Sequence, residues 1–217
     1  MSTATRIIAI RHGETAWNVD TRIQGQLDVD LNARGLWQAQ RAADALADEA
    51  IDAVYASDLL RAHTTARAIA SKMQAPAARE VRLHQGLRER GFGIFEGMTY
   101  AQIANKWPED ARRWSLRDPD FAPQGGETLV QLRQRVAQTV HALASQHLGE
   151  QIVLVAHGGI MDAMYRLATQ QDISAPRTWE LGNAAINRLL WTPEAFTLVG
   201  WSDVRHLDDS TIDEISA

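Results

Sequence analysis

Arg11 and His12 stand at the end of an apolar run, residues 7–10, and Gly13 follows them directly. In an open α/β sheet, ligands bind outside the carboxyl ends of the strands, and a glycine there lets the backbone and side chains approach a ligand closely. An arginine offers phosphate oxygens a planar fork of donors, and a neutral histidine offers a ring nitrogen that can attack phosphorus. The run therefore indicates a phosphate site, although a surface arginine beside an inert histidine would read the same way.

A second basic residue, Arg61, follows a weaker apolar run. It falls in the first turn of a helix predicted at 59–73, where free backbone N–H groups and the positive end of the helix dipole favour an anion. Such an arginine can complete a phosphate cradle with Arg11. The alternative is a solvated helix arginine, with Asp58 or Ser57 acting only as the helix cap.

His157 and Gly158 repeat the opening pattern, because they too follow an apolar run, residues 152–156. The two histidine motifs can converge only if their strands are neighbours in one sheet, which an α/β pattern permits. A carboxyl group, Glu89, lies among arginines and glycines in another segment. It is either an acid for the same site or one half of an ordinary surface salt bridge.

A metal centre is the main rival interpretation for histidines grouped with a glutamate. The chain has no cysteine and no His-x-x-x-His spacing, and two arginines at the site would repel a divalent cation. We therefore expect neither a metal nor an organic cofactor. The remaining histidines lack a comparable setting and are expected at the surface or in packing; they are His63, His84, His141, His147 and His206.

The apolar pattern also predicts the elements that position these groups. Short apolar runs at 6–10, 152–156 and, more weakly, 53–56 are typical of buried parallel strands. Segments 185–191 and 196–201 are typical of an antiparallel edge pair. Helical stripes lie between the strands: Leu36, Ala39, Ala43, Leu46 and Ala47 after an N-cap at Asn32, and Leu129, Leu132, Val136, Val140, Leu143 and Ala144 in a helix ending at His147. The prediction is an α/β fold with a mostly parallel sheet and one antiparallel edge.

The segment from about 85 to 126 interrupts this alternation of strand and helix. Thr99 and Gln102 form a capping box for one short helix, and Pro108 opens another. Such excursions commonly form the wall or lid of a site, and this helical insertion is expected over the carboxyl ends of the strands. Its aromatic residues are expected mainly to pack it onto the body, with one or two lining a pocket; they are Phe95, Trp107, Trp114 and Phe121.

Composition limits the classes of function. The 217 residues carry a net charge of −5 and are 45% hydrophobic, which is ordinary for a single globular domain, here 1–207, followed by an acidic tail at 208–217. The negative balance argues against a nucleic-acid surface, so an anion must be bound by a local cluster. The lack of cysteine excludes disulfides and a thiol nucleophile. No apolar run can span a membrane and no secretory signal is visible, so a cytoplasmic location is expected.

The ordered set of motifs resembles the histidine phosphatase superfamily, branch 1, also called the phosphoglycerate mutase-like family. The resemblance covers about residues 6 to 160 and rests on Arg11-His12-Gly13-Glu14-Thr15 with Trp17-Asn18, Gln24-Gly25, Asp28 to Leu31, Gly35, Ser57-Asp58-Leu59 with Arg61 and Thr64 to Ala66, Leu87-Arg88-Glu89, Gly93, Glu96-Gly97, Gly125-Gly126-Glu127-Thr128 and His157-Gly158. No single motif is decisive, but the set in this order is very specific. The family fold is a three-layer α/β/α sandwich, which agrees with the elements predicted above.

The resemblance implies a role for each core residue. His12 would be the nucleophile that becomes phosphorylated, Arg11, Arg61 and His157 would bind the transferring phosphoryl group, and Glu89 would be the proton donor. The nearby arginines are expected to keep the His12 imidazole neutral, with its other ring nitrogen donating to a backbone carbonyl such as that of Gly13. Further substrate-binding residues implied by the resemblance are Asn18, Gln24, Gly25 and Gly158.

Two reactions share such a site, namely hydrolysis of a phosphomonoester and mutation of phosphoglycerate. The mutases of the family carry a longer insertion, rich in lysine and arginine, that helps to hold a bisphosphate. Here 35 residues separate Glu89 from Gly125, and they include one lysine, Lys106. Three arginines keep a mutase possible but are expected on solvated helix faces; they are Arg112, Arg113 and Arg117.

The sequence therefore predicts a phosphatase that acts on a small-molecule phosphate ester through a phosphohistidine. The alternative is a 2,3-bisphosphoglycerate-dependent phosphoglycerate mutase. A non-catalytic phospho-ligand binding protein is less favoured, because all five core residues are present. Neither a nucleic acid nor a membrane is expected as a partner, and a homodimer remains open.

Overall fold

The computed structural model describes residues 4–208. Within them lies a six-stranded sheet in the order β3-β2-β4-β1-β5-β6. Strands β3, β2, β4 and β1 run parallel, whereas β5 pairs antiparallel with both β1 and β6. The strands are β1 (Thr5–Arg11), β2 (Ala53–Ala56), β3 (Val81–Leu83), β4 (Gln151–Ala156), β5 (Ile186–Trp191) and β6 (Phe196–Asp203). The predicted α/β fold, with a mostly parallel sheet and an antiparallel edge, is confirmed.

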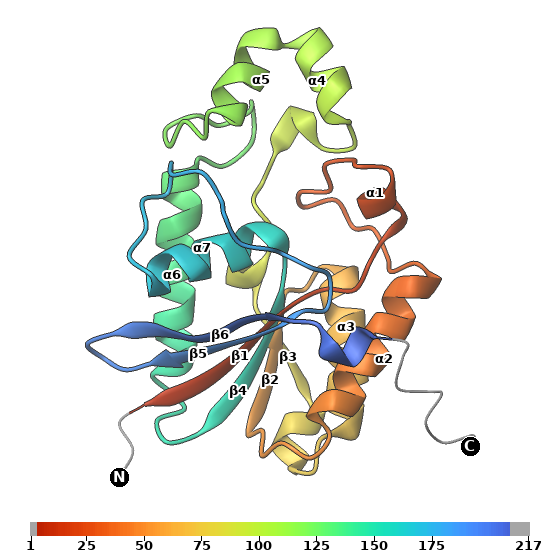
Figure 1. The fold of residues 1–217 in the computed structure, drawn as a ribbon, viewed down its shortest axis with the longest axis vertical. Helices are drawn as coiled ribbons and strands as arrows, with labels where there is room; N and C mark the ends of the chain where they lie inside the picture. Colours follow the sequence, from red (N-terminus) through yellow and green to blue (C-terminus); the bar gives the residue numbers. More distant parts are fainter. Residues whose placement is uncertain (1–3, 209–217) are drawn as a thin grey trace.

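Helices cover both faces of this sheet, as Figure 1 shows. Helices α2 and α3 pack on one face, and α6 and α7 pack on the other. In β1 the side chains alternate between the two cores, with Ile7 in one and Ile8 in the other, as expected for a strand buried on both sides. The α-helices are α1 (Ala16–Val19), α2 (Ala33–Leu46), α3 (Leu60–Lys72), α4 (Tyr100–Lys106), α5 (Pro108–Ser115), α6 (Leu129–Ala144) and α7 (Gly158–Ala168).

Most helix starts agree with the cap residues read from the sequence. The Asn32 side chain accepts the Gly35 N–H at the start of α2, and Thr99 opens α4 with the predicted capping box. One detail of the prediction is wrong, because Leu36, expected on the buried stripe of α2, is 52% exposed. The N-cap of α3 is Leu59, without a side-chain cap, so neither Ser57 nor Asp58 caps this helix.

The insertion has a small hydrophobic core of its own, separate from the two cores beside the sheet. Phe95, Ile103, Ala111 and Phe121 are buried in it, and the rings of Trp107 and Trp114 pack against Phe95. Helices α4 and α5 and this core lie beyond the carboxyl ends of the parallel strands, at the top of Figure 1. Four short 3-10 helices complete the elements: Pro76–Arg79, Gln85–Leu87, Gly93–Phe95 and Arg205–Leu207. Apart from Asp208, the predicted acidic tail lies outside the described residues.

Candidate active site

The two histidine motifs meet at the carboxyl ends of neighbouring strands. β1 and β4 are parallel partners, with Arg11 opposite Ala156, and the His12 N–H donates to the Ala156 carbonyl at 2.9 Å. The rings of His12 and His157 lie 5.2 Å apart, centroid to centroid, and both residues are buried. The strand order thus brings together two residues that are far apart in the sequence.

One nitrogen of the His12 ring is fixed by its own backbone. Nδ1 lies 2.7 Å from the Gly13 carbonyl oxygen, so Nδ1 carries the hydrogen and Nε2 is left with its lone pair. Burial, reinforced by the charges of Arg11 and Arg61, holds the pKa of His12 well below 6.5. The imidazole is therefore neutral at pH 7, which is the state that a nucleophilic histidine requires. Gly13 is needed for this turn, because a Cβ there would lie 2.4 Å from the Gly35 carbonyl oxygen.

Four buried nitrogens around His12 have no hydrogen-bond partner among the described residues. They are Arg11 Nε, Arg61 Nε and both ring nitrogens of His157. Unpaired buried polar groups are rare in folded proteins, and a set of converging donors is the usual way to bind an oxyanion. Arg11, Arg61 and one ring nitrogen of His157 thus provide a cradle of donors that suits the oxygens of a phosphoryl group.

Backbone carbonyls aim the two arginines of this cradle. Arg61 is fully buried and donates to the carbonyls of Leu27 at 2.8 Å and Gly25 at 2.7 Å. Arg11 donates to the Leu181 carbonyl from the segment after α7. Burial is the largest cause that lowers the pKa of both arginines, and burial also holds the pKa of His157 well below 6.5. A dianion placed among these groups would offset part of the burial cost.

Glu89 is held by the first turn of α7. The Gly159 N–H lies 3.1 Å from each carboxylate oxygen, and the Arg90 N–H donates to Oε1 at 2.7 Å. A Cβ on Gly159 would lie 2.3 Å from Oε1, so only glycine allows this approach. The neighbouring residue Gly158 lies beside both Arg11 and Glu89. The carboxyl group therefore has a fixed place at the edge of the cradle and is not paired with its flanking arginines.

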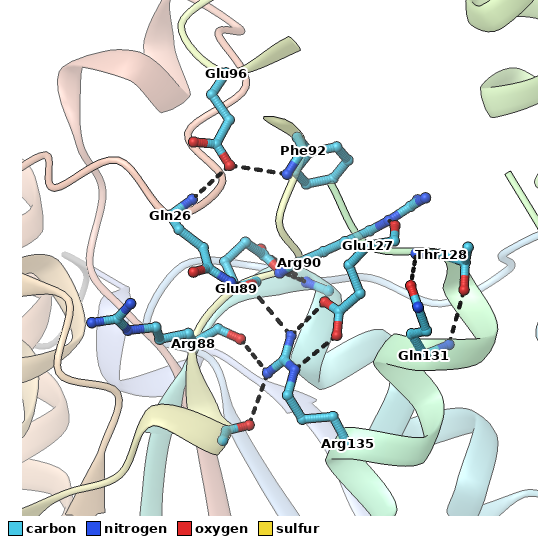
Figure 2. A network of polar contacts seen from close by, with 12 residues as sticks. Gln26, Arg88, Glu89, Arg90, Phe92, Glu96, Glu127, Thr128, Gln131 and Arg135 are labelled. Carbon is cyan, nitrogen blue, oxygen red and sulfur yellow. Dashed lines mark hydrogen bonds and ion pairs between the residues drawn. The ribbon is translucent and has the colours of Figure 1, made fainter. Parts of the chain in front are cut away.

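Arg135 on α6 holds the segment that carries Glu89, as Figure 2 shows. Its guanidinium donates to the carboxylate of Glu127 at 2.7 and 2.9 Å. It also reaches the carbonyls of Gly86 at 2.9 Å, Arg88 at 2.8 Å and, more weakly, Glu89 at 3.4 Å. Arg135 could not be identified from the sequence, because no local pattern shows which carbonyls a helix arginine will reach.

Asn18, Gln24 and Gly25 line a small cavity of about 190 Å³ together with His12 and Arg61. The Asn18 Oδ1 atom is used in the cap of α1, where it accepts the Thr15 N–H at 3.0 Å, so its amide NH₂ group is the part free to meet a ligand. The Oε1 atom of Gln24 is buried without a partner. Gly25 acts through Arg61, because the Gly25 carbonyl accepts a hydrogen bond from the Arg61 guanidinium.

A wider cavity of about 480 Å³ adjoins the small one and shares Arg11, Glu89 and Phe92 with it. The insertion forms one wall, and Trp114 is among its lining aromatics. The expectation that Arg117 lies on a solvated helix face is wrong. It follows α5, lines this cavity and donates to the Asp162 carboxylate at 2.8 Å. The full lining is Arg11, Glu89, Arg90, Phe92, Trp114, Arg117, Leu129, Leu132, Gly158, Gly159, Asp162, Arg177, Glu180, Leu181 and Gly182.

Within residues 4–208, no group of three or more His, Cys, Asp or Glu side chains is arranged to hold a metal ion. None of the helices in the same range combines the length and apolar character that crossing a membrane requires. Metal independence remains a prediction.

Comparison with known proteins agrees with this fold. The chain belongs to the histidine phosphatase superfamily (branch 1), whose family model matches residues 7–204. It is 38% identical over 207 residues to the phosphoglycerate mutase-like protein 4 of Arabidopsis thaliana, covering 94% of this chain and 87% of that protein. It is also 38% identical over 208 residues to a metal-independent phosphoserine phosphatase of the same plant, covering 95% and 84%.

A solved structure shows the same fold. The Bacillus stearothermophilus protein YhfR superimposes with a TM-score of 0.86 at 26% sequence identity, covering 94% of this chain and all of that one. The family, the relatives and the fold support a phosphatase of this superfamily.

Proposed function

We propose that this protein is a phosphomonoester hydrolase that acts on a small phosphorylated metabolite through a phosphohistidine at His12. The observation that carries the proposal is the set of unpartnered buried nitrogens from Arg11, Arg61 and His157 around a neutral imidazole. Such a set stabilises the equatorial oxygens of a phosphoryl group during transfer. A relative named as a metal-independent phosphoserine phosphatase supports the same reaction class.

In the first step, the Nε2 lone pair of His12 attacks phosphorus and the bond from phosphorus to the ester oxygen breaks. The Glu89 carboxylic acid gives its proton to the departing oxygen, so an alcohol leaves. The Gly13 carbonyl keeps the Nδ1 hydrogen in place and stabilises the positive charge that the ring acquires. Arg11, Arg61 and His157 are placed to share the charge on the phosphoryl oxygens.

In the second step, the Glu89 carboxylate takes a proton from a water molecule whose oxygen attacks phosphorus. The bond from Nε2 to phosphorus breaks, inorganic phosphate leaves, and His12 regains its neutral form. Atoms and charge balance without a metal or an organic cofactor. One carboxyl group serves as acid and then as base, consistent with its fixed position against the Gly159 N–H.

Hydrolysis is favoured over the mutase alternative by the way the insertion uses its cations. Arg112 pairs with Glu109 at 3.3 Å and Arg113 pairs with Asp118 at 2.7 Å, so neither faces the cavity as an unpaired charge. Lys106 lies over the ring of Trp107. These three cations are absent from the lining of the wide cavity, and Arg117, which does line it, is paired with Asp162, so none of them is left for a bisphosphate. A non-catalytic binding protein would not need an acid beside the nucleophile.

The direct test replaces His12 and Glu89 separately and measures release of inorganic phosphate from a panel of phosphomonoesters. His12→Ala should remove the covalent route and leave no detectable turnover. Glu89→Gln should slow the reaction by about 10²- to 10⁴-fold, because it removes general acid and base catalysis. A radiolabelled phosphate from the substrate, trapped by a quench in base, should be found on the wild-type protein and not on His12→Ala.

His63→Ala is the matched control, because His63 lies on α3 outside both cavities. The same panel should include a coupled assay that converts 3-phosphoglycerate to 2-phosphoglycerate in the presence of 2,3-bisphosphoglycerate. Strong mutase activity with little hydrolysis would establish the alternative. Normal turnover by His12→Ala would exclude the mechanism altogether.

A further inference from the structure

The wide cavity lies on the side of Glu89 where the leaving alcohol has to be placed. The nucleophile and the leaving oxygen lie on opposite sides of phosphorus during transfer, and the acid that protonates the leaving oxygen must be next to it. Glu89 and Gly158 line the wide cavity, whereas His12 lines only the smaller one. Residues further along the wide cavity therefore face the alcohol part of the substrate. This inference rests on the proposed function.

Most cations around this cavity are already used by the protein. Arg90 donates to the carbonyls of Glu127 at 2.8 Å and Phe121 at 2.9 Å. Arg117 donates to the carboxylate of Asp162 at 2.8 Å and to the Ile173 carbonyl. Both have structural partners, and Arg11 belongs to the phosphate cradle. Neither Arg90 nor Arg117 is left as a free charge for a substrate.

Arg177 differs from these cations. It is exposed, lines the wide cavity and makes no hydrogen bond or ion pair with any residue in the described range 4–208. Its charge reaches the phosphate cradle, since it contributes to lowering the pKa of Arg11. A guanidinium that repels the cradle from nearby is stabilised when an anion lies between them.

The chain on both sides of Arg177 is held in place. Before it, the buried Arg166 donates to the carbonyls of Asp172 and Ala175. After it, Trp179 packs against the Arg166 guanidinium with 4.7 Å between guanidinium carbon and ring centroid, and the Leu181 carbonyl accepts Arg11. The backbone that carries Arg177 is therefore anchored within two residues before it and two residues after it. Its guanidinium is limited to a region at the cavity wall.

We propose that Arg177 binds a carboxylate on the alcohol part of the substrate, so that the protein acts on phosphate esters of small hydroxy acids. One unpaired guanidinium matches one carboxylate, which it can bind through two parallel N–H bonds. A second phosphate is less suited to the same place. The cavity wall also carries the carboxylates of Glu89, Asp162 and Glu180, which would repel a second dianion. Phosphorylated hydroxy acids and phosphorylated α-amino acids share this chemistry.

The test compares Arg177→Gln with the wild-type protein on four esters. 3-Phosphoglycerate and phosphoserine carry the carboxylate, and glycerol 3-phosphate and phosphoethanolamine lack it. We expect Arg177→Gln to lower kcat/KM about 10-fold or more for the first two, as for loss of a charged hydrogen bond, and to leave the last two within about 2-fold. The ratio of phosphoserine to 3-phosphoglycerate in the wild-type protein then shows which of the two acids is preferred.

Arg112→Gln is the matched control, because Arg112 is an exposed arginine of the insertion that does not line the cavity. It should leave all four values unchanged. An equal loss on all four esters, or no loss on the two acids, would overturn the carboxylate site while leaving the hydrolase intact.

A binding experiment separates this proposal from the proposed function. His12→Ala cannot turn its substrate over, so its affinity for 3-phosphoglycerate and glycerol 3-phosphate can be measured by calorimetry. Adding Arg177→Gln should weaken binding of 3-phosphoglycerate alone. If the wild-type protein hydrolyses nothing but this selective loss is seen, the hydrolase is wrong and the carboxylate site holds. If the two esters bind equally with and without Arg177, the carboxylate site is wrong.

Discussion

The buried pair His12 and His157 makes the stability of the folded protein depend on pH. Burial holds the pKa of both His12 and His157 well below 6.5 in the folded protein. The unfolded chain takes up protons near pH 6.5, whereas the folded chain does not until a much lower pH. The contribution of the two neutral histidines to the free energy of unfolding is therefore fully present above pH 6.5. It is lost as the pH falls towards their pKa values in the folded protein.

We therefore predict a steep loss of stability on mild acidification. Each histidine should lower the free energy of unfolding by about 1.4 kcal/mol for each pH unit below 6.5, so the pair should contribute about 2.8 kcal/mol per unit. Urea unfolding between pH 5 and 7.5 measures this slope. His12→Gln should remove about half of the pair's contribution, and a slope equal to that of the wild type would show that His12 titrates normally in the folded state.

At the scale of single residues, the sequence identified the residues that carry the chemistry but not those that hold or surround them. Arg11, Arg61 and His157 could be chosen because each lies at a recognisable strand end or helix start, whereas the role of Glu89 followed from the family resemblance, since a glutamate between two arginines is usually a surface salt bridge. The structure brings all four to His12. Arg135 and Arg177 could not be chosen, because their importance depends on backbone carbonyls and cavity walls that come from distant segments.

At the level of elements, α6 lines the wide cavity with Leu129 and Leu132 and holds the Glu89 segment through Arg135. The network in Figure 2 joins this helix to the segment 86–89 by the carbonyls of Gly86, Arg88 and Glu89. A lysine keeps the charge but has no rigid fork, so it cannot bind Glu127 in two places and reach these carbonyls together. Arg135 is thus a positioning residue for Glu89.

Arg135→Lys should lower kcat about 10-fold or more through misplacement of Glu89, with little change in KM. A fall in kcat without a change in KM is the readout that a purely structural defect would not give. Arg133→Lys is a close control, because Arg133 lies on the same helix and donates to the Gln171 carbonyl at 2.9 Å. Equal effects of the two substitutions on kcat and on KM would argue against the positioning role.

The apolar pattern of the sequence predicts some of the elements and not others. Strands β1, β2 and β4 could be predicted because burial on both faces produces continuous apolar runs. Strand β3 could not, since Val81, Arg82 and Leu83 form a three-residue edge strand with two exposed side chains. Leu36 misled the prediction of the α2 stripe, because spacing alone does not show where the neighbouring element ends.

At the scale of the whole molecule, residues 4–208 contain three hydrophobic cores, and the one in the insertion is much the smallest. Its stability depends on few side chains, with Phe95 fully buried at the centre of the rings of Trp107, Trp114 and Phe121. The insertion can therefore open while the sheet and its helices stay folded, because the energetics of a protein are not uniform across it.

Phe95→Ala should cost about 3–5 kcal/mol of local stability, as for other buried Phe to Ala changes. We expect faster hydrogen exchange across residues 93–121 and a fall in kcat/KM, with exchange in β1 and β4 unchanged. Leu116→Ala, at a 64% exposed position in the same insertion, should change neither. Equal acceleration of exchange in the sheet would show that the insertion and the body unfold as one unit.

The hydrogen bond from Arg11 to the Leu181 carbonyl limits which positions can be changed to alter the substrate range. The phosphate cradle comes mainly from strand ends and α3. The part of the wide cavity away from the cradle is lined by the insertion and by the segment that follows α7. Libraries aimed at a new alcohol can vary the side chains at 174–178 without touching the nucleophile. They should leave the backbone at 181 alone, because that carbonyl aims Arg11. An engineer can thus exchange what the enzyme recognises while the chemistry stays in place.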